Sequence, residues 1–270
     1  VYFRQGNNSI LAGQNSNDTY ILSANETYVL IRDYSGEDVV KFASNVTYAN
    51  TFFTYNGESV NIWMEDSNSN VEIQGDASNF TFVFADGRTI TNLKDELLTD
   101  VSYIDYVMSA KLQELKLLGY DSLTVTGNAN DNLIIGNYGN STFIAGLGND
   151  RIESTFGGND TYIFNFGDNY DYIVDKGGND TIRFGEGATT SNIRFLKDFS
   201  SNNLEFWFAT EEDSQLGVTI ENYFGDDDSK IENFVFADGS TITDVSDKIW
   251  AWASNSDVTL ADGIVEAHLR

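Results

Sequence analysis

IAGLGNDRIESTFGGNDTYIFNFGDNYDYIVDKGGNDTIRF, residues 144–184, repeats one short pattern four times. In each copy a turn that contains glycine leads to an aspartate, and an apolar or aromatic residue follows two positions later. The four pairs are Asp150 with Ile152, Asp160 with Tyr162, Asp171 with Ile173, and Asp180 with Ile182. Short repeats of this kind predict a coil of stacked parallel strands. Glycine permits the positive φ angles of tight turns, and the alternation around Ile152 gives a strand one buried face.

The aspartates of this pattern indicate what the turns bind. In a stacked coil the turns lie above one another, so that carboxylate oxygens and turn carbonyl oxygens come together. Such hard oxygen ligands suit Ca²⁺, whereas Mg²⁺ demands stricter octahedral geometry and retains its waters. The residues alone also allow another interpretation, a turn-rich β protein in which the Gly-Asn-Asp turns are incidental.

This stretch resembles the glycine-rich nonapeptide repeat of RTX (repeats-in-toxin) proteins, the haemolysin-type calcium-binding proteins that type I secretion exports. The segments GGNDTYIFNFGD at 157–168 and KGGNDTIRFGEG at 176–187 are closest to the family pattern G-G-x-G-x-D-x-apolar-x. The resemblance implies a calcium-binding parallel β-roll, or parallel β-helix, in which each calcium lies between turns two strands apart. Residues 43–91 and 188–243 resemble the β-hairpin domain that follows such coils.

Carried onto this sequence, the resemblance implies four pairs of facing turns: Asp131 with 145–150, 136–141 with 155–160, Asp150 with 168–171, and Asp160 with 177–180. Ala129 stands where the family has a glycine and Ser141 where it has an aspartate, so the first two pairs depart from the pattern. Together the turns predict roughly two to four bound calcium ions. The implied metal-site residues are Asp131, Gly146, Gly148, Asp150, Gly157, Gly158, Asp160, Asp168, Asp171, Gly177, Gly178 and Asp180, with Gly136, Gly139, Asp18 and Asp38 as weaker candidates.

The chain contains two copies of one module, of which the second is longer. NDTYI at 17–21 recurs at 159–163, an offset of 142, and FVFADGRTIT at 82–91 recurs as FVFADGSTIT at 234–243, an offset of 152. The first copy has lost most of its turn glycines and keeps two well-placed acids, Asp18 and Asp38. We therefore expect weak calcium binding in the first copy, or none.

Outside the glycine-rich coils, two further patterns predict other elements. Residues 43–91 and 188–243 alternate apolar and polar residues between turn clusters, which predicts antiparallel hairpins that cap the coils. Residues 92–118 have an apolar residue every three or four positions, which predicts a connecting helix within 92–123. The clustered aromatic residues of 204–224 have two interpretations, core packing or a platform on which sugars stack.

The composition limits the partners of the chain. Among 270 residues, 42 acidic and 15 basic side chains give a net charge of −27, which excludes general nucleic-acid binding and disfavours anionic membranes. Repulsion among these carboxylates destabilises a compact fold unless cations neutralise some of them. No apolar run is long enough to span a bilayer, so no transmembrane segment is predicted.

Residues that commonly carry catalysis are scarce in this sequence. The chain has no cysteine and one histidine, His268, so that disulfides are excluded and zinc is disfavoured. Carboxylate pairs are too numerous for any one of them to mark a glycosidase-like site. The chain is therefore not expected to be an enzyme.

These observations predict a mainly β protein of tandem calcium-binding coils. Its parts are a degenerate RTX coil with capping hairpins (1–91), a connecting α-helix (92–123), an RTX β-roll (124–187), a second capping hairpin domain (188–243) and a C-terminal tail (244–270). The resemblance implies part of a type I-secreted bacterial surface or extracellular protein (a surface-layer protein, adhesin or toxin) that folds on binding calcium outside the cell. Self-association and cell-surface polysaccharide are further expected partners, and the alternative function is a polysaccharide-binding module of a secreted exoenzyme.

Overall fold

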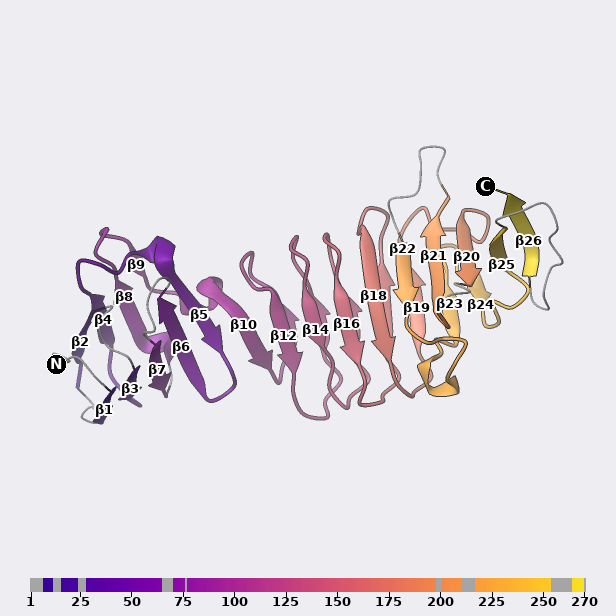
Figure 1. Cartoon of the computed structure of the whole chain (residues 1–270). Helices are drawn as coiled ribbons and strands as arrows, with labels where there is room; N and C mark the ends of the chain where they lie inside the picture. The colour runs from indigo at the N-terminus through magenta and orange to yellow at the C-terminus, as the bar shows by residue number, and fades with distance from the viewer. Residues whose placement is uncertain are drawn as a thin grey trace. The chain divides into compact units, whose positions relative to one another are not determined.

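The computed structural model consists almost entirely of β-strands (Figure 1). It describes residues 7–11, 16–23, 28–64, 70–75, 77–197, 201–209, 217–253 and 264–269. In these ranges the helices are four short 3₁₀ turns, and none of them is long or apolar enough to cross a bilayer. The chain divides into two compact units, residues 1–101 with 109–112, and residues 102–108 with 113–270.

The second unit is a parallel coil of two sheets. One sheet contains β12 (Glu114–Leu117), β14 (Leu133–Ile135), β16 (Arg151–Ser154) and β18 (Tyr170–Asp175); the other contains β11 (Tyr106–Val107), β13 (Thr124–Thr126), β15 (Thr142–Ile144), β17 (Thr161–Phe164) and β19 (Thr181–Phe184). From β13 to β19 the chain alternates between the sheets, so each coil contributes one strand to each. All pairs between these strands are parallel, which confirms the predicted mainly β fold with β-roll coils.

The core of the coil lies between its two sheets. In the first sheet Ile134 pairs with Ile152 and Ile152 with Ile173, and in the second Phe143 pairs with Tyr162. All five side chains are fully buried, because the central residue of each short strand points inward and its two neighbours point outward. The rings of Phe143 and Tyr162 stack with their centroids 5.4 Å apart. The apolar residue of each repeat therefore forms one column of the core.

The predicted hairpins are present, and they continue the coil sheets instead of forming a separate domain. β20 (Ile193–Lys197), β21 (Leu204–Phe208) and β22 (Gly217–Ile220) form an antiparallel meander, and β23 (Asn233–Val235) forms a hairpin with β24 (Thr241–Ile242). β22 then pairs in parallel with β18, and β23 with β19. β25 (Ile249–Ala253) and β26 (Ile264–Leu269) extend the meander sheet, although their side chains beyond Ile249, including His268, lie outside the described part.

Aromatic side chains fill the space between the last coil and the meander. Phe184 contacts Phe206, Phe208 and Phe236 with ring centroids 5.2, 6.2 and 4.9 Å apart. Phe206, Phe208 and Tyr223 are buried. At these residues of 204–224, core packing is therefore the correct interpretation of the aromatic cluster.

The first unit repeats this topology. Its sheets have the strand orders β1-β3-β7-β6-β5-β10 and β2-β4-β8-β9. The strands are β1 (Asn7–Leu11), β2 (Thr19–Leu22), β3 (Tyr28–Arg32), β4 (Asp38–Phe42), β5 (Thr51–Tyr55), β6 (Ser59–Met64), β7 (Asn70–Gln74), β8 (Phe80–Val83), β9 (Thr89–Ile90) and β10 (Leu97–Ser102). The coil strands pair in parallel, and β5, β6 and β7 form the antiparallel meander.

The predicted helix at 92–118 is wrong. This segment contains a 3₁₀ turn (Leu93–Glu96) followed by the strands β10, β11 and β12. Leu115 and Leu117 are buried on either side of the exposed Lys116, as in a strand, and β12 pairs with β14. Several very short strands follow one another here, and the loops between them also contain apolar residues. Together they place an apolar residue at every third or fourth position, which resembles the period of a helix. Pairing with neighbouring strands then decides the backbone conformation, as tertiary context often does.

The core column predicts that Ile152→Ala lowers the free energy of unfolding by about 2–5 kcal/mol, because the side chain is fully buried and its removal leaves a cavity. Urea denaturation in calcium-containing buffer measures this change. Ile163→Ala, at a partly exposed position of β17, is the matched control and is expected to cost less. Equal losses in both variants would contradict a core placed between the two sheets.

Candidate metal centre

The loops of the second unit form two rows, one along each edge of the coil. The Asp150 row consists of the loops that precede strands of the β14–β16–β18 sheet, at 127–132, 145–150 and 165–171. The Asp160 row consists of the loops that precede strands of the other sheet, at 136–141, 155–160 and 176–180. The two rows contain every metal-site residue that was predicted in this part of the chain.

An aspartate joins each loop to the loop before it in the same row. In the Asp150 row, Asp150 Oδ1 accepts the peptide N–H of Asn132 at 2.7 Å and Asp171 Oδ1 accepts that of Asp150 at 2.9 Å. In the Asp160 row, Asp160 Oδ1 accepts from Ser141 N–H and Asp180 Oδ1 from Asp160 N–H, both at 2.7 Å. The structure therefore brings together the four pairs of turns that the resemblance implied.

Several glycines are required because the carbonyl of the neighbouring loop lies where a side chain would be. A Cβ at Gly148 would lie 2.4 Å from Asn130 O, and a Cβ at Gly158 would lie 2.5 Å from Gly139 O. At Gly178 the distance to Gly158 O would be 1.8 Å. A Cβ at Gly146 would likewise clash with Asn128 O, and a Cβ at Gly139 with Asp121 O. A Cβ at Gly136 would instead clash with the Ser154 hydroxyl. Gly157 and Gly177 have positive φ angles without such a close carbonyl.

Asp131 does not occupy the position of Asp150. The strand register pairs Leu133 with Arg151, so that the buried Asn132 is the counterpart of Asp150. Asp131 is exposed one position earlier, and its Oδ1 accepts the N–H of Asn149 at 2.8 Å. Asp131 was predicted because it carries a carboxylate, whereas Asn132 is identified only by the register. That Asp131 is a ligand stays a prediction.

Asp168 is engaged within its own loop. Its Oδ2 accepts the N–H of Asn165 at 2.7 Å and the Asn165 side-chain amide at 3.3 Å. The step from Asp160 to Asp171 is eleven residues, and within the loop Asn169 adopts a left-handed conformation with φ 65°. Asp168 therefore stabilises the widened loop, and a role for it in metal binding stays a prediction.

Four buried carboxyl oxygens have no hydrogen-bond donor in the described part of the chain: the Oδ2 atoms of Asp150, Asp171, Asp175 and Asp180. Burial raises the pKa of Asp150 to about 7 and that of Asp171 to about 8. Burial also raises the pKa of both Asp175 and Asp180, which lie close together. Each carboxyl group thus needs either a proton or a cation, because an unpaired buried charge is strongly unfavourable.

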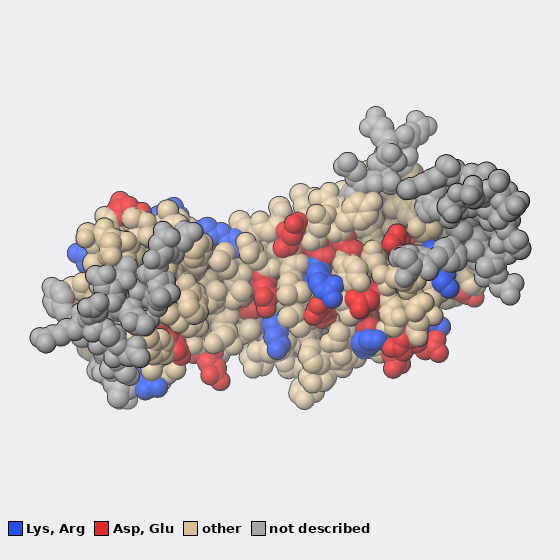
Figure 2. Space-filling view, viewed as in Figure 1, with Lys and Arg blue, Asp and Glu red and all other residues tan. Residues whose placement is uncertain are grey.

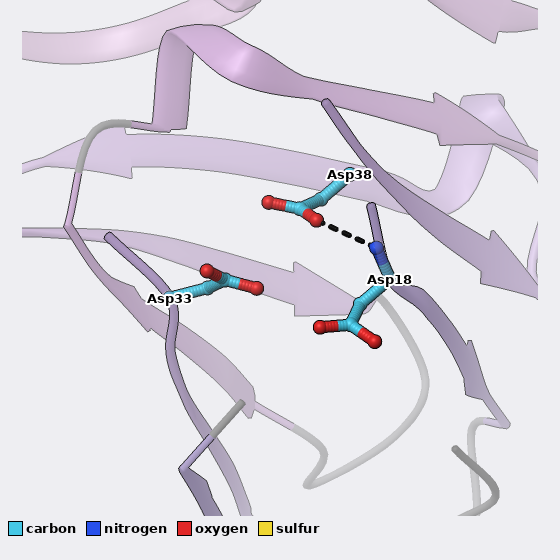
Figure 3. Close-up of side chains that lie close together, drawn as sticks. All are labelled: Asp18, Asp33 and Asp38. Carbon is cyan, nitrogen blue, oxygen red and sulfur yellow. Dashed lines mark hydrogen bonds between the residues drawn. The ribbon is translucent and has the colours of Figure 1, made fainter. Parts of the chain in front are cut away.

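Asp160, Asp175 and Asp180 bring one carboxylate oxygen each within 4.8 Å of the others. The Ser154 hydroxyl donates to Asp160 Oδ2 and the Tyr162 hydroxyl donates to Asp175 Oδ1. Asp175 was not predicted, since it stands at the end of β18 outside the glycine pattern. A signal existed, because Asp33 stands five residues before Asp38 just as Asp175 stands five residues before Asp180. In the first unit Asp18, Asp33 and Asp38 form a similar group (Figure 3).

The donor set fits calcium. The groups that converge in the two rows are carboxylates, side-chain amides, hydroxyls and turn carbonyls, all of which offer oxygen. Zinc sites use nitrogen and sulfur ligands, whereas calcium takes six to eight oxygens in flexible geometry. On the face of the molecule drawn in Figure 2, acidic and basic side chains lie interspersed on a largely neutral surface. Part of the large negative charge is instead buried in the turns.

Comparison with known proteins supports the same assignment. Residues 212–245 match the family described as "Haemolysin-type calcium binding protein related domain". This match contains β22, β23 and β24, which follow the coil, and it confirms the predicted resemblance to haemolysin-type calcium-binding proteins. No curated protein sequence matches the chain.

Among solved structures, the extracellular lipase LipA from Serratia marcescens is similar at 16% sequence identity and a TM-score of 0.24. The similarity covers 90% of this chain and 38% of the lipase chain, so this chain spans well under half of the lipase. At this TM-score the similarity bears on neither the fold nor the function.

The stacked carbonyl at Gly178 predicts that Gly178→Ala disrupts the Asp160 row. The new Cβ clashes with Gly158 O, so we expect a loss of about 1–3 kcal/mol beyond backbone strain. Gly177→Ala is the matched control, because Gly177 has a positive φ of 70° but no atom within 4 Å of a Cβ. Thermal denaturation and calcium titration of both variants test this, and similar behaviour of the two would contradict the stacked-turn arrangement.

The buried carboxyls predict that the calcium-free chain loses stability as the pH rises. An unfolded aspartate titrates near pH 4 (about 3.9), whereas burial raises the folded pKa of Asp160 to about 6 and that of Asp171 to about 8. Folding therefore takes up protons in this window, and the resulting stability is complete below about pH 4 and is lost as the pH rises through about 8.

Urea denaturation in calcium-free buffer is expected to give a midpoint that falls between pH 5 and pH 8. With saturating calcium we expect the opposite slope, since protons then compete with the cation for the same oxygens. A calcium-free midpoint that rises with pH would show that these carboxyls are not buried in the folded chain.

Proposed function

We propose that this chain is a calcium-binding β-roll module that completes its fold when calcium occupies its rows of turns. The observation that carries this proposal is the set of buried Oδ2 atoms without a donor, on Asp150, Asp171, Asp175 and Asp180. These oxygens favour a ligand that offers positive charge or hydrogen-bond donors to several of them at once. The match to a haemolysin-type calcium-binding related domain supports calcium as that ligand.

The energetics explain why the fold depends on the cation. An ionised carboxylate that is buried without a partner costs several kcal/mol even after relaxation. Bound calcium supplies the positive charge, and the free oxygens coordinate it. Asp150 and Asp171 hold their own row together through their Oδ1 atoms, and Asp160 and Asp180 do the same in the other row. At a free calcium concentration one hundred times the Kd of a site, binding at that site adds about 2.7 kcal/mol to the free energy of unfolding.

A fold that depends on calcium allows the chain to be exported before it folds. At low calcium the carboxylates of a chain with net charge −27 repel one another, so the coil is destabilised. At the higher calcium concentration outside a cell, binding free energy becomes folding free energy. We therefore propose a structural or assembly role in a type I-secreted bacterial surface or extracellular protein, such as a surface-layer protein, an adhesin or a toxin.

Polysaccharide binding is the alternative function. The aromatic side chains that could have formed a sugar platform, Phe206, Phe208 and Tyr223, are buried in the core. A polar groove of about 420 Å³ beside Tyr172, Asn203 and Glu221 is the surface at which a saccharide would be sought. Self-association and the absence of catalysis likewise stay predictions.

Circular dichroism tests the metal-coupled folding. At pH 8, where the calcium-free fold has lost the stability that its protonated carboxyls provide, we expect a largely disordered spectrum in EDTA, a β-rich spectrum after addition of calcium, and a much smaller change with magnesium at the same concentration. Tyr162 and the other buried aromatic residues give a near-ultraviolet signal that reports tertiary packing in the same sample. A chain that is fully folded in EDTA and unchanged by calcium would rule out this function.

A further inference from the structure

The two units contain the same cluster of three aspartates, which is fully buried in the second unit and half-buried at Asp18 in the first. Asp18, Asp33 and Asp38 form the cluster of the first unit, and Asp160, Asp175 and Asp180 form that of the second. The spacing is fifteen and then five residues in both, and each member is offset by 142 from its counterpart. In each cluster one carboxylate oxygen of every member lies within 4.8 Å of the others.

The same elements position the three side chains in both units. The first aspartate immediately precedes β2 or β17. The second directly follows β3 or ends β18, and the third begins β4 or directly precedes β19. Figure 3 shows the carboxylates of Asp18, Asp33 and Asp38 gathered around one point from three different segments. Because the three aspartates belong to three successive strands, the coil itself assembles the cluster.

Two hydrogen bonds are shared by the clusters. A tyrosine of the first strand holds the second aspartate: Tyr20 donates its hydroxyl to Asp33 Oδ2 at 2.6 Å, and Tyr162 does so to Asp175 Oδ1. The peptide N–H of the first aspartate holds the third: Asp18 N–H donates to Asp38 Oδ1 at 2.9 Å, and Asp160 N–H donates to Asp180 Oδ1. Both bonds orient the carboxylates without neutralising them.

The turn beside the cluster is also the same. A Cβ at Gly36 would lie 2.2 Å from Ser16 O, and a Cβ at Gly178 would lie 1.8 Å from Gly158 O. Gly36 is the counterpart of Gly178 at the same offset of 142. The first unit, which has lost most other turn glycines, therefore retains the one glycine that this cluster requires.

The second unit shows that the cluster lacks a ligand. Asp175 and Asp180 have side chains that are 2% and 1% exposed, and the Oδ2 atom of each has no hydrogen-bond donor in the described part of the chain. No Lys or Arg of the described residues forms an ion pair with Asp160, Asp175 or Asp180. Three carboxylates and a hydroxyl, without nitrogen or sulfur, are the donors that calcium takes.

We propose that each cluster binds one calcium ion, with Asp33 and Asp175 as ligands that the glycine repeat does not supply. This inference rests on the proposed calcium-binding function and extends it to the first unit, where the loss of turn glycines had predicted weak binding or none. The first unit is then a second calcium site and not only a scaffold.

Counting the bound ions tests the inference. The complete chain is loaded with calcium, and native mass spectrometry gives the number of ions per chain. Asp33→Asn and Asp175→Asn preserve the side-chain size and an acceptor for the tyrosine hydroxyl but remove the charge. We expect each variant to lose one calcium ion and the double variant to lose two. Asp86→Asn and Asp238→Asn, at equivalent exposed turns of the two units, remove the same charge and are expected to retain every ion.

The outcomes separate this inference from the proposed function. If the unaltered chain binds calcium and both cluster variants keep the full number of ions, the inference is overturned while the calcium-binding function stands. That result would mean that the clusters hold protons. If the unaltered chain binds no calcium, both the inference and the proposed function fail.

A second pair of variants covers the case in which an Asn variant does not fold, which circular dichroism in calcium would reveal. Tyr20→Phe and Tyr162→Phe keep all three carboxylates and remove only the hydrogen bond that orients the second aspartate. Because the loss of such an orienting group weakens metal binding by roughly 10- to 100-fold, we expect one site per variant to weaken in a calcium titration. Unchanged affinity at every site in both variants would overturn the inference.

Discussion

The hydrogen bond from a turn's peptide N–H to an aspartate Oδ1 in the next coil is the interaction on which the second unit depends. It joins Asn132 to Asp150, Asp150 to Asp171, Ser141 to Asp160 and Asp160 to Asp180. A charged acceptor makes such a bond worth about 1.5–3 kcal/mol. The same bond draws the carboxylate into the protein, where its other oxygen has no donor at Asp150, Asp171 or Asp180. Stacking of the turns and the need for a cation are thus consequences of one contact.

The end of the coil is covered by strands of its own sheets. A parallel coil buries each layer of its core against the next, so the last layer requires a cap. β22 and β23 continue the two sheets beyond β18 and β19, and β21, the antiparallel partner of β22, brings Phe206 and Phe208 over the last layer. The cap is therefore part of the β-roll sheets, and the family match lies across its strands.

The strands of 92–118 and the inward position of Asn132 were not evident from the sequence for one physical reason. Strands of two to six residues are too short to establish their own period, so the leucines of 92–118 resembled a helix although β12 pairs with β14. Because the loops differ in length, the sequence does not show the register between β14 and β16. That register places Asn132, and not Asp131, at the inward position. In both cases the deciding contact is with a residue about eighteen positions away.

Sequence alone was sufficient to predict the parallel coils, the buried apolar column, the hairpins and the turns that face each other. These features depend on local properties, namely the freedom of glycine to adopt positive φ angles and the alternation of side chains along a strand. Only the tertiary structure decided which oxygens converge. Asp33 and Asp175 stand outside the glycine pattern, and they join Asp18 and Asp160 across fifteen residues because the coil returns each segment to the same edge.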